Sequence, residues 1–324
     1  MTTTPVLITG FNRPDKIRRL LVALAEVRPS RIYVALDGTA VEEDIRKCEE
    51  TRKAIESIWW PCSLTINASE VNLGCRRRMS TGIAWLFENE EKAIILEDDC
   101  IPHPSFFGYC DELLERYTGN PEVMMICGFT VPSGRQTRRT TDYFFAPTFN
   151  TVWGWATWRR AWRKYDDSMP GWQELRTTDW LKTWLRGDHS FAASEATKLD
   201  RVWRDKLDTW DYVWKYCIYR ERGKVVIPTR NMIENIGYGS GATHTHKDKI
   251  GLGTTKAQPI RMPLRHPCST EISWAPVQHQ RRWVQHQRRR QLKRQKGRPR
   301  YYYEQLKHRI ANSGIYMRLK HALT

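Results

Sequence analysis

Short apolar runs alternate with segments of helical apolar spacing along the first hundred residues. The apolar runs predict buried strands, and the intervening segments predict helices with one apolar face. The predicted strands cover residues 6–10, 31–36, 63–66 and 92–96, and the predicted helices begin at Pro14 and cover residues 41–58 and 79–87. Strands that alternate with helices in this way predict a parallel sheet with right-handed crossovers.

Polar residues follow the predicted strands at the point where each strand ends. They are Asn12 and Arg13, Asp37, Asn72, and the run Glu97, Asp98 and Asp99. In a sheet of this kind, ligands bind at the carboxyl ends of the strands. Each residue alone is also compatible with a turn or a helix cap. Their repetition at successive strand ends predicts a ligand site at this edge of the sheet.

The acidic run Glu97, Asp98 and Asp99 is the strongest chemical signal in the chain. It directly follows the apolar segment 92–96, where a buried strand is predicted. Burying a charge is costly unless the charge is paired or binds a metal ion. A hard divalent cation that bridges to a diphosphate would explain three carboxylates at this position. The run therefore favours a nucleotide-dependent enzyme.

The second half of the chain is rich in tryptophan. A helix is predicted over residues 105–117, strands are predicted over 123–128 and 224–228, and ten of the 15 tryptophans fall between Trp153 and Trp214. Those with helical spacing, namely Trp158, Trp162, Trp180 and Trp184, are assigned to the core. Trp153 and Trp155 flank Gly154 and are predicted to form a pocket wall on the acceptor side of an enzyme, because aromatic faces bind the apolar surfaces of sugars well.

We divide the chain into three parts. Residues 1–130 are predicted to form the nucleotide-binding half, residues 131–274 the acceptor-binding half, and residues 275–324 a basic tail.

Positive charge is concentrated at the C-terminal end. Residues 275–324 hold 14 of the 53 basic residues and one of the 36 acidic residues, so they carry +13 of the net charge of +17. We interpret this tail as attachment to an anionic membrane, with an amphipathic helix over residues 303–321. A solvated tail is the alternative, and nucleic-acid binding through it would be nonspecific.

Location and cysteine chemistry follow from the remaining composition. There is no apolar run long enough to cross a membrane, and no basic region that would predict a signal peptide near the first residues. The eight cysteines form no CxxC pair and no zinc-like cluster. Reduced thiols and a cytoplasmic location are expected, with the tail as a peripheral contact to the inner face of the membrane.

The order of these elements, together with the motif Ile-Leu-Glu-Asp-Asp-Cys-Ile-Pro-His-Pro-Ser-Phe-Phe at residues 95–107, resembles the GT-A fold glycosyltransferases. The resemblance covers roughly residues 5–250. It is nearest to bacterial sugar transferases of the hemolysin-like kind, and more distant to the Golgi N-acetylglucosaminyltransferase that initiates complex N-glycans. It implies an α/β fold with a Rossmann-like, mostly parallel central sheet flanked by helices. It also implies a UDP-sugar donor, Mn²⁺ or Mg²⁺, and a glycan or lipid-linked acceptor.

The resemblance also implies roles for individual residues on the donor side. It makes Asp99 the metal ligand, and it implies that Asp98 contacts the ribose or sugar and that Glu97 contacts the sugar. It assigns Asp37 to the base or ribose, and Asn12 or Arg13 to the nucleotide pocket. Arg78 is expected to approach the diphosphate. Arg76 and Arg77 are weaker candidates for the diphosphate. A solvated helix face is the alternative for the whole arginine triplet.

Trp210 and Asp211 resemble the segment of this family that carries the catalytic base. An inverting transferase needs one carboxylate to deprotonate the acceptor hydroxyl, and Trp210 would contact the acceptor. The alternative is that Asp208 or Asp211 caps the following helix. His244, after the glycine-rich segment 235–241, is a candidate metal ligand, and His246 is a weaker one. An exposed loop is the alternative for both histidines.

Two other functions are compatible with the sequence. A nucleotidyltransferase would use a similar sheet and metal ion, but it would usually carry a glycine-rich, lysine-bearing phosphate loop after the first strand. Residues 10–14, Gly-Phe-Asn-Arg-Pro, do not form such a loop. A non-catalytic protein that acts through the basic tail is the third hypothesis. The acidic run and the Trp210–Asp211 pair argue against it.

Overall fold

The predicted N-terminal strands and helices are present in the structure, a computed structural model that describes residues 2–39, 41–131, 140–238 and 251–296. The elements are β1 (Val6–Gly10), α1 (Pro14–Ala25), β2 (Arg31–Leu36), α2 (Glu42–Glu56), β3 (Ser63–Ala68), α3 (Gly74–Asn89) and β4 (Lys92–Glu97). The apolar stripe of α1 is buried at Ile17, Leu20, Leu21 and Leu24. The prediction differs most at α3, which begins five residues earlier than its apolar pattern indicates.

One eight-stranded sheet runs through the molecule in the order β3-β2-β1-β4-β8-β6-β9-β7. The C-terminal part of this sheet consists of β6 (Val123–Cys127), β7 (Tyr143–Ala146), β8 (Trp155–Trp158) and β9 (Lys224–Pro228). The pairs β3–β2, β2–β1, β1–β4 and β6–β9 are parallel. Only β8 and β7 run in the opposite direction within this described sheet. The predicted mostly parallel α/β sheet is confirmed.

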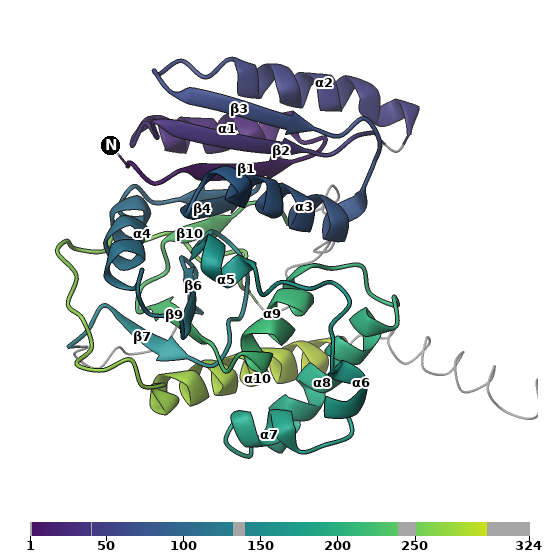
Figure 1. The fold of residues 1–324 in the computed structure, drawn as a ribbon, viewed down its shortest axis with the longest axis vertical. Helices are drawn as coiled ribbons and strands as arrows, with labels where there is room; N and C mark the ends of the chain where they lie inside the picture. Colours follow the sequence, from purple (N-terminus) through teal and green to yellow (C-terminus); the bar gives the residue numbers. More distant parts are fainter. Residues whose placement is uncertain (1, 40, 132–139, 239–250, 297–324) are drawn as a thin grey trace, which may run out of the picture.

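Helices cover both faces of the sheet (Figure 1). On one face, α1, α2 and α4 (Ser105–Arg116) contribute to a single apolar cluster. On the other face, α3 packs with helices from the tryptophan-rich half. These helices are α5 (Arg159–Trp162), α6 (Trp172–Leu175), α7 (Trp180–Trp184), α8 (His189–Trp203) and α9 (Asp211–Arg220). The two faces therefore form two cores, and both span the predicted boundary at residue 130.

A second, two-stranded sheet connects distant parts of the chain. It pairs β5 (Cys100–Pro102) with β10 (Ile233–Asn235) in antiparallel register, with Asn235 opposite Cys100. Because β5 begins directly after the acidic run, this pairing brings residues 235–237 next to Asp99. Neither strand is apparent from the sequence pattern, since each has only three residues.

The basic C-terminal segment begins as a helix that packs on the domain. This helix, α10 (Trp274–Lys296), buries Val277, Gln280 and Arg281. Arg288, Arg289 and Arg290 are exposed further along it. No helix among the described residues combines the length and apolarity needed to span a bilayer. The predicted helix over residues 303–321 lies outside the described residues.

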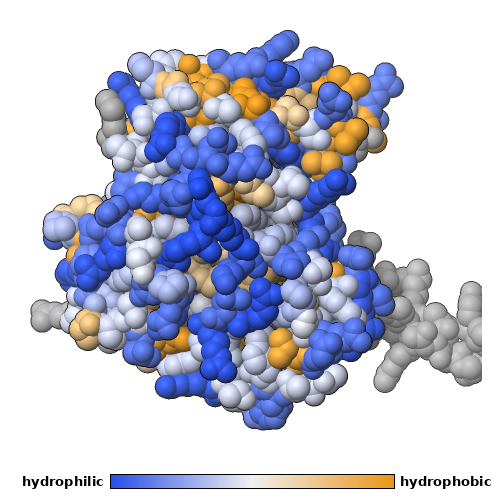
Figure 2. Space-filling view, in the orientation of Figure 1, coloured by the Kyte–Doolittle hydropathy of each residue, from blue (hydrophilic) through white to orange (hydrophobic). Residues whose placement is uncertain are grey.

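The surface seen in Figure 2 is mostly hydrophilic, and hydrophobic residues gather near its upper end, over the layer of β1–β3 and α2. The large apolar side chains that are exposed in the N-terminal region include Val22, Ile45 and Trp59.

The four tryptophans that the sequence assigned to the core are buried or half-buried. Trp158 lies in β8 rather than in a helix, which corrects its predicted environment.

Candidate functional site

A cavity of about 640 Å³ lies where β1, β2 and β4 end. This volume is within the usual range for small-molecule sites. Most of the predicted site residues line it: Arg13, Asp37, Arg78, Glu97, Asp98, Asp99, Trp153, Trp210 and Asp211. Asn12 and Trp155 are not among the lining residues. His244 and His246 lie outside the described residues.

Arg13 neutralises part of the acidic run. It directly precedes α1, and its Nη1 donates a hydrogen bond to Asp99 Oδ2 at 2.9 Å. Its Nη2 lies 2.7 Å from Asp98 Oδ1, but the geometry of that ion pair is not that of a hydrogen bond. The acidic neighbours outweigh the effect of burial and raise the pKa of Arg13. The guanidinium therefore holds two of the three carboxylates in place.

Arg13 does not fully balance the acids. Burial, followed by repulsion from Asp99 and Asp98, raises the pKa of Glu97 to about 8. Burial also raises the pKa of Asp98 to about 7, although Arg13 opposes the shift. A single guanidinium is thus insufficient for this cluster. A further cation would stabilise the ionised carboxylates.

Asp99 is fixed by a segment that lies far away in the sequence. Asn235 Nδ2 donates to Asp99 Oδ1 at 3.1 Å, and the backbone N–H of Ile236 donates to the carbonyl of Asp99 at 2.8 Å. The backbone of Gly237 packs so closely on Asp99 that an added Cβ would overlap Oδ2. Asn235 and Gly237 line the cavity, but no local signal in the sequence connects them to the acids.

The carboxylate oxygens at this site are the groups that could hold a metal ion. Carboxylate oxygens are suitable ligands for Mg²⁺ and Mn²⁺, and Asp99 can accept more bonds than Arg13 and Asn235 supply. Within the described ranges, however, no three His, Cys, Asp or Glu side chains are arranged to hold a metal ion. The protein would therefore supply few of the ligands, as is common for Mg²⁺ bound with phosphates.

Asp37 has the structural role in a turn that the sequence left open as its alternative. Its carboxylate accepts hydrogen bonds from the backbone N–H groups of Leu73 at 2.8 Å and Gly74 at 3.1 Å. It thereby holds the turn that leads into α3. Asn12 is also engaged elsewhere, because its Nδ2 donates to Asp44 Oδ1 at 2.6 Å. Of the pair Asn12 and Arg13, only Arg13 lines the cavity.

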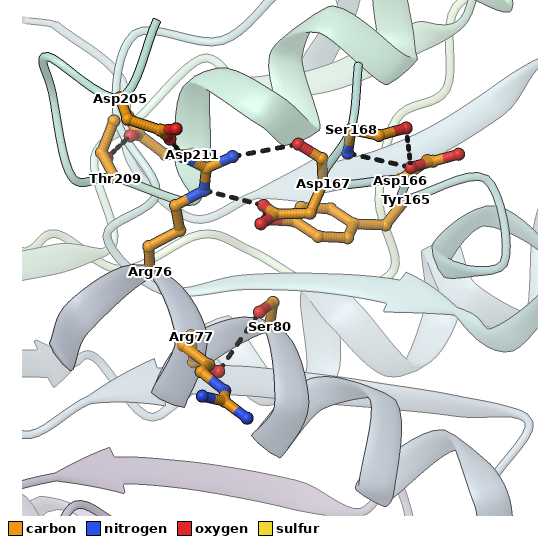
Figure 3. A network of polar contacts seen from close by, with 10 residues as sticks. All are labelled: Arg76, Arg77, Ser80, Tyr165, Asp166, Asp167, Ser168, Asp205, Thr209 and Asp211. Atoms are coloured by element: carbon orange, nitrogen blue, oxygen red, sulfur yellow. Dashed lines mark hydrogen bonds and ion pairs between the residues drawn. The ribbon is translucent and has the colours of Figure 1, made fainter. Parts of the chain in front are cut away.

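The three arginines of α3 have different environments. Arg76 donates to Asp167 Oδ1 at 2.8 Å and to Asp205 Oδ1 at 3.0 Å. Figure 3 shows that it reaches from α3 to the loops beside Asp211, whereas Arg77 lies on another side of the helix. Arg77 is exposed. Arg76 and Arg77 are both absent from the lining of the cavity.

Arg78 is the arginine that faces the cavity. Its side chain is buried, and its Nη2 donates to the carbonyl oxygen of Asn67 at 2.9 Å and to Asn67 Oδ1 at 2.8 Å. Its Nε has no hydrogen-bond partner in the described part of the chain. Burial lowers the pKa of Arg78, and nearby Asp37 offsets this only in part. A buried cation with an unused donor indicates an anion-binding position.

Asp211 also lines the cavity, at the first position of α9. The N-cap residue is Trp210, and this helix has no side-chain capping hydrogen bond within the described part of the chain. The structure therefore does not show the capping interaction that was the alternative for Asp208 or Asp211. Instead, the hydroxyl of Thr209 donates a hydrogen bond to Asp211 Oδ1. This bond orients the carboxylate in the wall of the cavity.

Aromatic side chains form much of the wall around Asp211. Trp210 and Tyr212 line the cavity on either side of it in the sequence, and Trp153 contributes from the loop before β8. Trp153 packs edge-on against Phe129, with ring centroids 4.7 Å apart. Trp155 does not form the wall that was predicted for it. It is fully buried, because β8 lies between β4 and β6 in the sheet.

No family model matches the sequence, and no curated protein matches it. Solved structures with some similarity include an active-site mutant of LgtC, at 11% identity and a TM-score of 0.38, covering 85% of this chain and 94% of that one. UDP-glucose pyrophosphorylase in complex with UDP-glucose has 9% sequence identity and a TM-score of 0.30, and the match covers 50% of this chain and 78% of that one. A 4-diphosphocytidyl-2C-methyl-D-erythritol synthase from Anaerococcus prevotii has 11% sequence identity and a TM-score of 0.33, and the match covers 51% of this chain and 76% of that one.

Proposed function

We propose that the chain is a metal-dependent, inverting glycosyltransferase of the hexosyltransferase type. It would transfer a sugar from a nucleoside diphosphate donor, most simply a UDP-sugar, to a hydroxyl of a glycan or lipid-linked acceptor. One observation carries this proposal. A single cavity is lined by the acidic run and the buried Arg78, here called the donor wall, and by Asp211 with Trp210, here called the acceptor wall. These two sets of residues could hold a donor and an acceptor in one cavity.

The donor wall would bind the nucleotide sugar by charge and hydrogen bonding. Arg78 would contact the diphosphate through its unused donor. Asp99 would hold Mn²⁺ or Mg²⁺, which when bound neutralises charge on the departing diphosphate. Arg13 keeps Asp98 and Asp99 oriented in the same wall. Asp98 and Glu97 would accept hydrogen bonds from ribose and sugar hydroxyls, and Asp37 would lie toward the base or ribose.

The acceptor wall would supply the base. Asp211 would take the proton of the acceptor hydroxyl as its oxygen attacks the anomeric carbon, while the sugar's bond to the diphosphate breaks. Thr209 occupies Oδ1, which leaves Oδ2 to receive the proton. One carboxylate suffices because the leaving group is already a weak base, whereas hydrolysis of a glycosidic bond requires a pair. Trp153 and Trp210 offer apolar faces to the acceptor ring.

A thermal-shift screen tests the proposal directly. The full chain is incubated with UDP-, GDP-, CDP- and dTDP-sugars, each with and without Mn²⁺. Because a ligand of the native state raises its unfolding temperature, one nucleotide class should stand out, and only with the metal ion. No shift with any nucleotide sugar would contradict the proposal. Release of pyrophosphate from a sugar phosphate and a nucleoside triphosphate would instead favour a nucleotidyltransferase.

The exposed arginines of α10 support a peripheral membrane contact. Arg288, Arg289 and Arg290 are adjacent and exposed, and each basic residue near an anionic bilayer contributes about 1 kcal/mol. Removing the whole tail would be a poor test, because the first half of α10 is part of the core. Replacing the three arginines by glutamine keeps that core. The full chain should float with phosphatidylserine liposomes more than this variant, and equal flotation would refute the contact.

A further inference from the structure

A cluster of three charged side chains lies behind the acceptor wall. Glu195 on α8 is only 1% exposed, and Lys215 on α9 is 5% exposed. Lys215 Nζ lies 3.1 Å from Glu195 Oε2, and Lys198 Nζ donates to Glu195 Oε1 at 2.8 Å. The hydroxyl of Tyr219 also donates to Oε2 at 3.2 Å. The carboxylate therefore has partners on both oxygens and joins α8 to α9.

The cluster reaches the cavity through Tyr212. Lys215 Nζ lies 4.8 Å from the centroid of the Tyr212 ring, and Lys198 Nζ lies 5.2 Å from it. Tyr212 lines the cavity beside Asp211. Residues three and four positions apart share one face of a helix, so Lys215 lies on the same side of α9 as Tyr212 and Asp211. Two ammonium groups thus lie close to an aromatic ring that forms part of the wall.

A purely structural role does not explain this arrangement fully. A buried ion pair is often no more stabilising than an apolar pair of similar size, so fastening α8 to α9 does not require these charges. An apolar pair would lack the attraction between an ammonium group and an aromatic face. That attraction acts here on a ring that borders the candidate base.

We propose that Lys215 is a positioning residue of the acceptor wall. Glu195 fixes the ammonium group of Lys215, and that ammonium group fixes the Tyr212 ring as a surface for the acceptor next to Asp211. The catalytic part of this inference rests on the proposed glycosyl transfer. The part that concerns the orientation of the Tyr212 ring does not depend on the proposed glycosyl transfer.

Three variants separate positioning from charge balance. Lys215→Met removes the ammonium group, and the double variant Lys215→Met with Glu195→Gln also removes the carboxylate, so that no uncompensated charge stays buried. Lys215→Arg keeps a cation near the ring. Lys182→Met is the matched control, because Lys182 on α7 pairs with Asp179, the residue before that helix, and is not among the residues that line the cavity. Tyr212 is labelled as 3-fluorotyrosine for fluorine NMR in each protein.

The unmodified chain, Lys182→Met and Lys215→Arg should each give one narrow fluorine resonance. Lys215→Met and the double variant should give broadened or multiple resonances, although thermal denaturation shows the double variant to be folded at the temperature of the NMR measurement. With methyl glycosides as acceptor probes and the UDP-sugar of largest thermal shift as donor, KM for the acceptor should rise roughly 2- to 30-fold in the double variant. UDP affinity should not change.

Two results would overturn the proposal. One is a single narrow Tyr212 resonance in the double variant. The other is a return of the acceptor KM to its wild-type value when Glu195→Gln is added to Lys215→Met, because charge balance alone would then explain the effect. Absence of any transfer by the unmodified chain would refute the proposed function instead. The fluorine spectra would still decide whether Lys215 positions the ring.

Discussion

Trp155 lies against Trp210, with ring centroids 5.5 Å apart and ring planes inclined by 23°. Trp210 lines the cavity, whereas Trp155 is fully buried beneath it. The residue that was predicted to contact the acceptor therefore supports the residue that lines the site. Its contribution is to packing, and a substitution there should affect the stability of the whole domain.

Trp155→Ala should reduce the free energy of unfolding by roughly 3–5 kcal/mol, the usual cost of removing a large buried aromatic side chain. Urea denaturation followed by circular dichroism measures this loss. Trp59→Ala is the control, because Trp59 is 62% exposed, and it should change stability by about 0.5 kcal/mol or less. A loss of similar size in both variants would show that burial of Trp155 is not the cause.

The N-terminal elements could be predicted because their signals are local. The stripe of α1 and the apolar runs of β1 and β2 depend only on residues within each element. In contrast, β7 and β8 have four residues each, all of them buried, so they show no alternation that would mark a strand. Their positions depend on pairing with β9 and with β4 and β6. Such long-range pairing has no counterpart in a local pattern.

The candidate site shows the same division between local and distant information. The acidic run was identifiable from sequence because three carboxylates after an apolar strand are unusual. The family resemblance singled out Arg78 from the triplet, but the local pattern gives no reason for that choice, because Arg76 is engaged by residues 91 and 129 positions away. Asn235 was overlooked as a partner of Asp99 for the same reason, since 136 positions separate them.

Arg78→Met should weaken binding of UDP in the presence of Mn²⁺ by roughly ten- to a hundredfold, because a hydrogen bond between charged groups contributes about 1.5–3 kcal/mol. The fold should persist, since the substitution also removes the cost of burying the cation. Isothermal titration calorimetry measures the affinity. Arg77→Met serves as the control, because Arg77 is exposed, and it should bind UDP normally. Equal weakening in both variants would argue for a general effect of charge.

Asp99→Ala should abolish the part of UDP binding that depends on Mn²⁺ and leave the fold intact. The residue is the candidate ligand that also anchors Arg13 and Asn235, so a thermal denaturation curve must accompany the titration. Calorimetry of UDP with and without Mn²⁺ gives the result. If the affinity of the Mn²⁺–UDP complex were unchanged in a folded variant, Asp99 would not be the metal ligand.

Asp211→Asn should separate binding from catalysis. Asparagine has nearly the same shape but cannot accept a proton at neutral pH, so donor binding should persist while transfer falls by at least ~100-fold, the usual loss on removal of a general base. Parallel measurements of UDP affinity and of sugar transfer reveal the difference. Turnover close to that of the unmodified chain would exclude Asp211 as the base.

Glu195 should make the stability of the protein sensitive to acid. Burial would raise the pKa of this carboxyl, but Lys215 and Lys198 outweigh burial and lower it from 4.5 to about 2. A lowered pKa in the folded state gives stability that is complete above pH 4.5 and is lost as the pH falls toward 2. The full contribution is roughly 3 kcal/mol, and about 1 kcal/mol of it should disappear between pH 5.5 and 3.5.

Glu195→Gln should remove this part of the pH dependence, because glutamine does not titrate. Urea denaturation at pH 5.5, 4.5 and 3.5 compares the free energy of unfolding of the two proteins, whose difference should shrink as the pH falls. Glu56→Gln is a suitable control, since the Glu56 side chain is 48% exposed and pairs only with Arg52 among the ion pairs of the described residues. A constant difference between the unmodified chain and Glu195→Gln across this range would mean that the two lysines do not hold Glu195 ionised in the folded state.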